Sequence, residues 1–481
     1  MRNRSEADSA APAAGRADAI EELLDFGLST SASELPDAVV ERTKLAILDT
    51  IGAALAAVRG EGVPALADLL HEWGGAPQAT ELVGGRRLPM VFATHINATA
   101  GRAWDLDDVH EQNTCHVNVN TVPAALALAE GRGPIAGRDL LAGIAVGSEL
   151  MCRVTDAPRI GFSETGSAMS YQCGFYGAAL TAARLLRLSK DRARHALGIA
   201  HAQVAGNHQG YVDGAMTVRL MQGIAAEGGL RAALMAERGL TGSAAVLEGR
   251  FGYYNVYHRG RYDREAILDG LGRRWLIHDI SIKPLYACCK YTHAPIDAAI
   301  AAARELAAAP DEIERVTIRV TNKEVHDLVC TTRERKWNPQ SVTDAQFSLP
   351  YTVASAIVRG RVDLDTFQPA GMCDARARAL LARIEVDLDL SAQGEGRGTF
   401  PMPGIVTLRA RNGKSAHARV DYVKGHPKNP MSFDDVAEKF RACAEFGRPG
   451  WNGAQAIVDA VRDLERLGDA GQIARLCVQG I

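Results

Sequence analysis

Several features that mark common protein classes are absent from this chain of 481 residues. Aromatic residues make up only 6% of it, which disfavours an aromatic-rich β-sandwich. No run of about 18 apolar residues occurs, so we expect no membrane span. The 54 basic and 57 acidic residues leave a net charge of -3, which gives no electrostatic reason to expect binding to nucleic acid or an anionic membrane.

The motifs of common cofactor and nucleophile sites are also missing. The chain has no GK[ST] phosphate loop, no GxGxxG after a strand and no GxSxG elbow, so nucleotide-dependent and serine-hydrolase chemistry lose support. HExxH, CxxC and EF-hand spacings are absent, which disfavours a metal site. Nine cysteines, an odd number scattered along the chain, favour a reducing, cytoplasmic compartment. We therefore expect neither a metal nor a cofactor.

Helical periodicity dominates the first half of the chain. Residues 35–58 place Val39, Thr43, Ile47 and Ile51 at spacings of four, which is one stripe along a helix. Small residues are frequent in 174–188 and 223–239. We expect these segments to be closely packed helices at the centre of a bundle.

The pattern changes after about residue 280. Residues 314–321 and 382–390 alternate between apolar and polar, as half-buried strands do. Residues 404–423 predict two strands joined at Asn412–Gly413, the strongest short hairpin signal in the chain. A helix is expected at 347–360, and helical patterns return after residue 430.

These patterns predict a mainly α protein with an α+β part. A large all-helical domain would be formed by both chain ends, with a smaller α+β domain inserted between them. The predicted boundaries are 1–19 for a flexible tail, 20–279 for the first helical part, 280–424 for the α+β domain and 425–481 for the C-terminal helical part.

One candidate site lies in residues 104–120, between two helical regions. Asp105, His110 and His116 stand there with two further aspartates and several asparagines. Loops on rigid scaffolds often carry catalytic groups, so the segment predicts a base and ligand-positioning cluster. The alternatives are an aspartate N-cap with a solvated loop, or a metal site, which the spacing disfavours.

A second candidate precedes the helix expected from residue 292. Lys283, Lys290 and His293 cluster at this entry, and Thr292 is the expected N-cap. Basic side chains at a helix N-terminus can bind an anion, although they can equally be solvated there.

Two further residues are candidates by their surroundings. Arg219 stands among apolar neighbours, and a buried arginine needs an anionic partner from the protein or a substrate carboxylate. Tyr351 falls in the first turn of the predicted helix 347–360, where it is either an oxyanion donor or a packing residue.

Six motifs, in order, resemble those of the MmgE/PrpD family, over about residues 20 to 475. They are KLAILDTIGAALA, WDLDDVH followed by VPAALALAEG, GFYGAALTAARLLRL, CCKYTHAPIDA, DAQFSLPYTVA and KGHPKNPMSFDDVAEKF. That family includes 2-methylcitrate dehydratase, cis-aconitate decarboxylase and iminodisuccinate epimerase. The resemblance implies a helical domain with an α+β lid, a homodimer, and an active site between the domains that uses neither metal nor nucleotide.

Carried over position by position, the resemblance implies catalytic roles for four residues. These are Asp105, His116, His293 and Tyr351. The remaining candidates are expected to bind the substrate, and these are Arg219, Lys283, His110 and Lys290. The chain departs from the family at Val109, where a threonine is usual, and at Val218, where a lysine is usual.

The predicted function is a cofactor-independent lyase of the 2-methylcitrate dehydratase type. It would abstract a proton next to a carboxylate of a small di- or tricarboxylate and release water. The same residues would also suit an epimerase or a decarboxylase. Val109 and Val218 favour a further alternative, a non-catalytic paralogue that only binds a carboxylate.

Overall fold

A computed structural model describes residues 16–392 and 402–480. Residues 1–15 of the predicted tail lie outside the described part of the chain. The end of the predicted tail contacts the helical part. The Asp18 carboxylate accepts hydrogen bonds from the backbone of Leu247 and Glu248 at 3.1 and 2.7 Å, and the Ala19 amide donates to Glu248 Oε2 at 2.7 Å.

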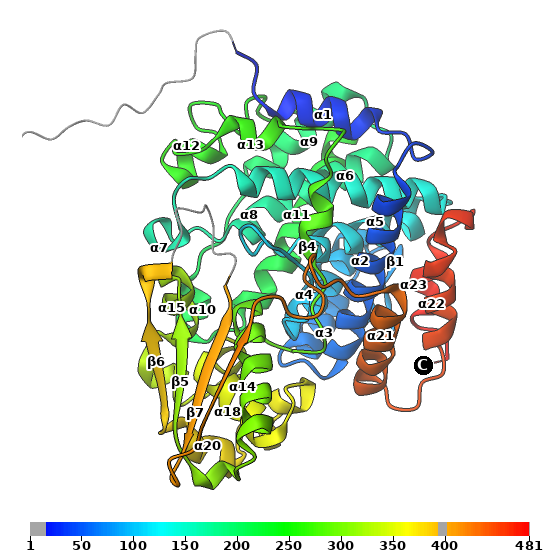
Figure 1. Cartoon of the computed structure of the whole chain (residues 1–481). Helices are drawn as coiled ribbons and strands as arrows, with labels where there is room; N and C mark the ends of the chain where they lie inside the picture. The colour runs from blue at the N-terminus through cyan, green and yellow to red at the C-terminus, as the bar shows by residue number, and fades with distance from the viewer. Residues whose placement is uncertain (1–15, 393–401, 481) are drawn as a thin grey trace, which may run out of the picture.

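The chain is mainly helical with small sheets, which confirms the predicted class (Figure 1). The first helical part holds α1 (Ile20–Ser29), α2 (Asp37–Ala56), α3 (Val63–Trp73), α4 (Met90–Ala103), α5 (Asn118–Arg132), α6 (Gly137–Asp156), α7 (Phe162–Thr165), α8 (Met169–Leu185), α9 (Lys190–His201), α10 (Gln209–Asp213), α11 (Thr217–Glu237), α12 (Tyr253–His258) and α13 (Arg264–Leu268). Among the described residues, no helix combines the length and apolar character that crossing a bilayer requires.

Helix α8 packs against both α6 and α11, and its contact with α11 joins the two segments whose small residues predicted close packing. A Cβ on Gly147 of α6 would lie 2.7 Å from the Gly177 carbonyl oxygen of α8. A Cβ on Gly229 of α11 would lie 2.5 Å from the Phe175 carbonyl oxygen of α8. Only glycine permits such close approach of two helix backbones.

The second part is built on a four-stranded sheet with the order β6-β5-β7-β8. Its strands are β5 (Ile313–Val320), β6 (Ile384–Leu388), β7 (Gly404–Ala410) and β8 (Ser415–Val420), and the predicted hairpin turns at Gly413 with a φ of 84°. Strand β6 is parallel to β5, and the other pairs are antiparallel. The helices of this part are α14 (His293–Leu306), α15 (Lys323–Cys330), α16 (Arg333–Lys336), α17 (Val342–Gln346), α18 (Leu349–Arg359), α19 (Pro369–Met372) and α20 (Ala375–Leu381).

One face of the sheet is buried under helices. Val316, Ile318 and Val320 of β5 are buried, and α14 packs against β7 and β8. Intervening residues carry charge pairs instead, since Arg319 lies 3.6 Å from Asp387 of β6. This alternation is what the sequence pattern predicted for half-buried strands.

The chain then returns to the helical part. The terminal helices α21 (Phe433–Gly447), α22 (Ala454–Arg462) and α23 (Gln472–Leu476), red in Figure 1, lie beside blue α2, against which α21 packs. A capping box at Ser432 and Asp435 starts α21.

A short ladder ties the two parts together where the candidate residues lie. Strand β3 (Val109–His110) follows the acidic loop, and it pairs antiparallel with β4 (Ile280–Ser281), just before Lys283. The Ile282 amide also donates to the Gly425 carbonyl at 3.2 Å. Segments distant in sequence are thereby fixed side by side.

Candidate active site

The loop after α4 turns sharply at Asp105. Its φ of 53° lies in the left-handed region, which aspartate tolerates better than most residues. Arg102, in the last turn of α4, donates from Nη1 to Asp105 Oδ1 and to Asp107 Oδ1, the latter at 3.3 Å. Lys283 donates from Nζ to Asp105 Oδ1 at 2.8 Å and to the Asp105 carbonyl at 2.7 Å.

These cations keep Asp105 ionised although it is buried. Burial alone would raise the pKa of its carboxyl, but the charges of Arg102 and Lys283 outweigh burial and hold the pKa below its ordinary value. The carboxylate is therefore the centre of a buried ion cluster.

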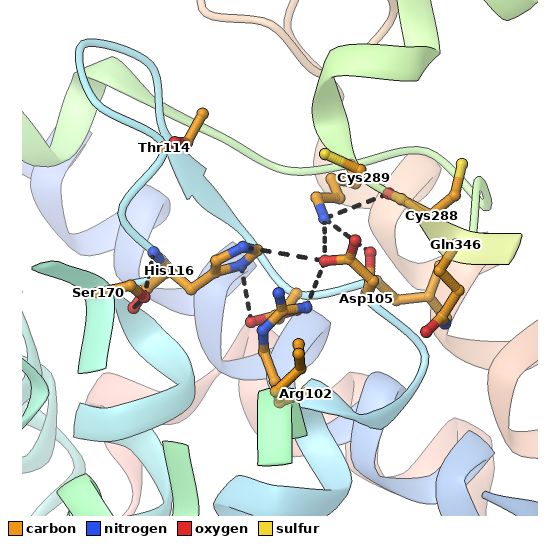
Figure 2. Close-up of polar contacts among 12 residues, drawn as sticks. Arg102, Asp105, Thr114, His116, Ser170, Cys288, Cys289 and Gln346 are labelled. Carbon is orange, nitrogen blue, oxygen red and sulfur yellow. Dashed lines mark hydrogen bonds and ion pairs between the residues drawn. The ribbon is translucent and has the colours of Figure 1, made fainter. Parts of the chain in front are cut away.

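His116 lies between the two carboxylates. Its Nδ1 lies 2.9 Å from Asp107 Oδ2, and its Nε2 lies 3.8 Å from Asp105 Oδ1 (Figure 2). The Nδ1 contact is close, but its geometry is not that of a hydrogen bond. Burial opposes ionisation of Asp107, yet the positive charge of Arg102 holds its pKa below the ordinary value. A neutral imidazole with its proton on Nδ1, facing the Asp107 carboxylate, has its lone pair on Nε2.

The imidazole of His116 is kept neutral by its surroundings. Burial lowers its pKa, the positive charge of Arg102 lowers it further, and Asp107 offsets these effects only in part. The backbone of His116 is also fixed, because its amide donates to Ser170 Oγ at 2.9 Å and its carbonyl accepts from Gln222 Nε2 at 3.2 Å. These two hydrogen bonds fix the backbone that carries the imidazole ring.

Asp108 has a structural role that the sequence offered as an alternative. Its Oδ1 accepts from the amides of Val117 and Asn118 at 3.2 and 3.1 Å, at the start of α5. Burial, with the nearby charge of Asp49, raises the pKa of Asp108 to about 7. This aspartate caps the helix that follows His116.

A pocket opens beside this cluster. Arg102, Asp105, His116 and Lys290 line it. Its other lining residues include several rings, which are Phe162, Tyr171, His208, Tyr211, Tyr291 and Phe347. Tyr171 donates its hydroxyl proton to the Val218 carbonyl at 2.8 Å, so Tyr211 donates to Tyr171 in the bond between the two hydroxyls.

Arg102 is a pocket residue that the sequence reasoning missed. Its Nη1 donates hydrogen bonds to Asp105 and Asp107. Its Nε and Nη2 are buried and make no hydrogen bond among the described residues. That pair of donors matches the geometry of a carboxylate. The signal in the sequence was an arginine three residues before Asp105, one helical turn away.

Residues 161–174, which contribute to the pocket wall, hold α7 and the beginning of α8 at Met169. Ser170 and Tyr171 therefore lie in the first turn of a helix, which explains their fixed positions beside His116.

The segment that carries Lys283, Lys290 and His293 contacts Asp105 through Lys283. Lys290 lines the pocket, with its Nζ 2.6 Å from Glu111 Oε1. His293 lies behind the pocket, where its Nε2 contacts the Cys288 carbonyl at 3.0 Å, the same oxygen that Lys283 reaches at 3.5 Å. Burial and the two lysines lower the pKa of His293 well below its ordinary value. Thr292, the expected N-cap, makes no capping hydrogen bond.

Three other candidates do not reach the pocket. The Tyr351 hydroxyl donates to the Thr366 carbonyl at 2.7 Å, within the core under the sheet. His110 lies 2.9 Å from Asp156 through Nε2. Arg219 bonds the Glu61 carbonyl at 3.0 Å and the Thr343 hydroxyl at 3.2 Å rather than the carboxylate we expected.

Asp105, Asp107 and His116 also form a cluster of possible metal ligands, since one donor atom from each lies within 4.8 Å of the others. Arg102 and Lys283 already bond to these carboxylates. A divalent cation would have to displace them against their charge repulsion. The electrostatics therefore favour the predicted metal-free site.

Comparison with known proteins places this site in a family. The MmgE/PrpD N-terminal domain model matches residues 21–265, and the C-terminal domain model matches residues 286–466. A cis-aconitate decarboxylase of Aspergillus terreus (strain NIH 2624 / FGSC A1156) is 28% identical over 95% of each chain. The cis-aconitate decarboxylase of Homo sapiens is 26% identical over 92% of this chain and 91% of its own. This chain belongs to the MmgE/PrpD family.

Proposed function

We propose that this protein is a cofactor-independent lyase that removes carbon dioxide from a small unsaturated polycarboxylate. The observation that carries the proposal is the position of His116 between Asp107 and Asp105, beside the unpaired edge of Arg102. The relatives named above are cis-aconitate decarboxylases, which supports loss of carbon dioxide as the reaction.

The chemistry needs a cation and a proton donor. When a carboxylate leaves the carbon next to a double bond, its electron pair shifts through that bond onto a remaining carboxylate. Arg102 can stabilise the developing charge by donating from Nε and Nη2 to that carboxylate. The carbon next to it then takes one proton, so each turnover consumes one proton and releases one carbon dioxide.

His116 is the proposed proton donor. Its lowered pKa leaves it neutral before binding, and the negative charge of a substrate beside Nε2 would raise that pKa. A proton would therefore enter with the substrate. Asp107 would hold Nδ1 and stabilise the imidazolium, while Lys283 would keep Asp105 in place.

The proposal gives no role to the predicted site residues His293, Lys290, Tyr351, His110 and Arg219. Tyr351, His110 and Arg219 do not line the pocket, and their side chains bond to other parts of the protein. Loss of water, which the sequence led us to expect, would use the same proton-transfer groups with a different leaving group. The product therefore distinguishes the two reactions.

The test is product analysis in D₂O with chelator-treated protein. The panel contains cis-aconitate, a 3-alkylglutaconate, 2-methylcitrate and a chiral amino-dicarboxylate, and the products are followed by NMR. Carbon dioxide release with one deuterium next to a carboxylate would support the proposal. Release of water, or exchange with inversion, would replace it by dehydratase or epimerase activity. No reaction by folded protein, or reaction only after metal is restored, would contradict it.

A further inference from the structure

A second cavity adjoins the pocket. It is a surface groove of about 420 Å³ between α7, α10 and α15. Four residues line both the groove and the pocket, and these are Phe162, His208, Tyr211 and Leu328. The two cavities therefore share a wall that these side chains form.

The shared wall is aromatic. The rings of Phe162 and His208 stack with centroids 4.5 Å apart, and His208 packs against Tyr211 at 5.2 Å. Val212, 47% exposed, continues this apolar surface outward. Burying apolar groups of a ligand against such a surface is favourable.

Among the residues that the structure describes, no lysine or arginine lines the groove, and its one acidic lining residue is Asp327. Glu324, on the same helix as Asp327, accepts a hydrogen bond from the Ser163 amide at 3.5 Å. Burial lowers the pKa of His208 to about 4, so this histidine carries no charge near neutral pH. An anionic group placed in the groove would meet no lining cation among the described residues, because the nearby Lys323 is paired with Asp327.

Few cationic groups of the pocket are available to bind a substrate. Lys290 is engaged with Glu111, and Lys283 with Asp105. Arg102 retains one unpaired edge, which suits one carboxylate. A compact tricarboxylate would leave two of its charges without a counterion in either cavity, whereas a dicarboxylate would leave one.

From this juxtaposition we infer that the groove binds an uncharged arm of the substrate. The inference rests on the proposed function, whose site it extends. The substrate is then an unsaturated dicarboxylate: one carboxylate lies on Arg102, the second is the one lost, and an alkyl or aryl substituent extends past Phe162 into the groove. The class is exemplified by 3-alkylglutaconates, in which an alkyl group replaces the central carboxylate of cis-aconitate.

Calorimetry with unreactive saturated analogues tests the arm without requiring turnover. The probes are 3-propylglutarate, which carries an apolar arm, and propane-1,2,3-tricarboxylate, which carries a third carboxylate instead. We expect the wild-type protein to bind the propyl compound at least about tenfold more tightly. Val212→Arg places a cation in the groove and should reduce that preference by about tenfold. The control is Val256→Arg, at a valine 53% exposed on α12 and outside both cavities, which should leave the preference unchanged.

Equal or tighter binding of the tricarboxylate, or no binding of either probe, would overturn the inference. So would identical preferences in the Val212→Arg and Val256→Arg variants. Turnover of 3-propylglutaconate is measured in parallel by carbon dioxide release. A protein that binds the propyl probe preferentially but releases no carbon dioxide retains the arm site and contradicts only the proposed reaction.

Discussion

Lys283 Nζ lies 2.8 Å from Asp105 Oδ1, and both side chains are buried. Asp105 belongs to the loop after α4, whereas Lys283 follows β4, so the pair joins the two segments that build the site. Without Lys283, the buried carboxylates of Asp105 and Asp107 would share one cation, Arg102, and an unbalanced buried charge costs about 3–5 kcal/mol.

We therefore expect Lys283→Met to lower the free energy of unfolding by about 3–5 kcal/mol in urea titrations. Adding Asp105→Asn should recover a large part of this loss, because the buried charge is removed. The matched control is Lys190→Met, whose lysine is 38% exposed in its pair with Asp25 and should change stability by less than about 1 kcal/mol. Equal effects of the two lysine variants would contradict the account of the ion pair.

Arg102→Lys should separate the two functions of this arginine. A lysine can still neutralise Asp105 and Asp107, but it lacks the second pair of donors that we assign to the substrate carboxylate. We expect carboxylate binding to weaken by about 10- to 100-fold in calorimetry, corresponding to about 1.5–3 kcal/mol. The comparison is Arg132→Lys, at the partly exposed pair with Glu237, which should bind like the wild type. Unchanged binding in Arg102→Lys would remove Arg102 from the substrate site.

His258 makes the stability depend on pH. Both its ring nitrogens are buried without hydrogen bonds among the described residues, and burial lowers its pKa to about 4. The unfolded chain, with a histidine pKa of about 6.5, binds protons at higher pH, so stability contributed by neutral His258 is lost as pH falls from about 6.5 toward 4.

The variant His258→Asn should therefore lose less stability on acidification. Between about pH 7.5 and pH 5 the wild type should lose about 2 kcal/mol more than the variant. Groups with the opposite dependence, such as Asp108, are common to both proteins and cancel in the comparison. Parallel pH profiles from urea unfolding would show that His258 is not held neutral.

Local patterns predicted much of the fold because their signals lie within a few residues. The alternation in β5, the Asn412–Gly413 turn and the glycine-rich helices α8 and α11 all appear where the sequence placed them. The mainly α class with an α+β part followed from the same periodicities.

The site was less predictable because it depends on contacts between distant segments. Tyr351 was expected in the site, but its hydroxyl bonds to Thr366, fifteen residues away, and nothing in the local pattern fixes that direction. Arg102 was overlooked because an arginine three residues before an aspartate is common on exposed helices. The pairing of β3 with β4 brings Lys283 beside Asp105, and no local pattern predicts this contact between distant segments.

The central claim is that His116 transfers the proton. Its most direct test is the rate of carbon dioxide release and deuterium incorporation in D₂O for wild-type protein and His116→Gln, with unchanged folding shown by circular dichroism. The account predicts that the variant binds the saturated dicarboxylate but turns over about 10²- to 10⁴-fold more slowly. Wild-type rates of release and deuterium incorporation in folded His116→Gln would contradict it.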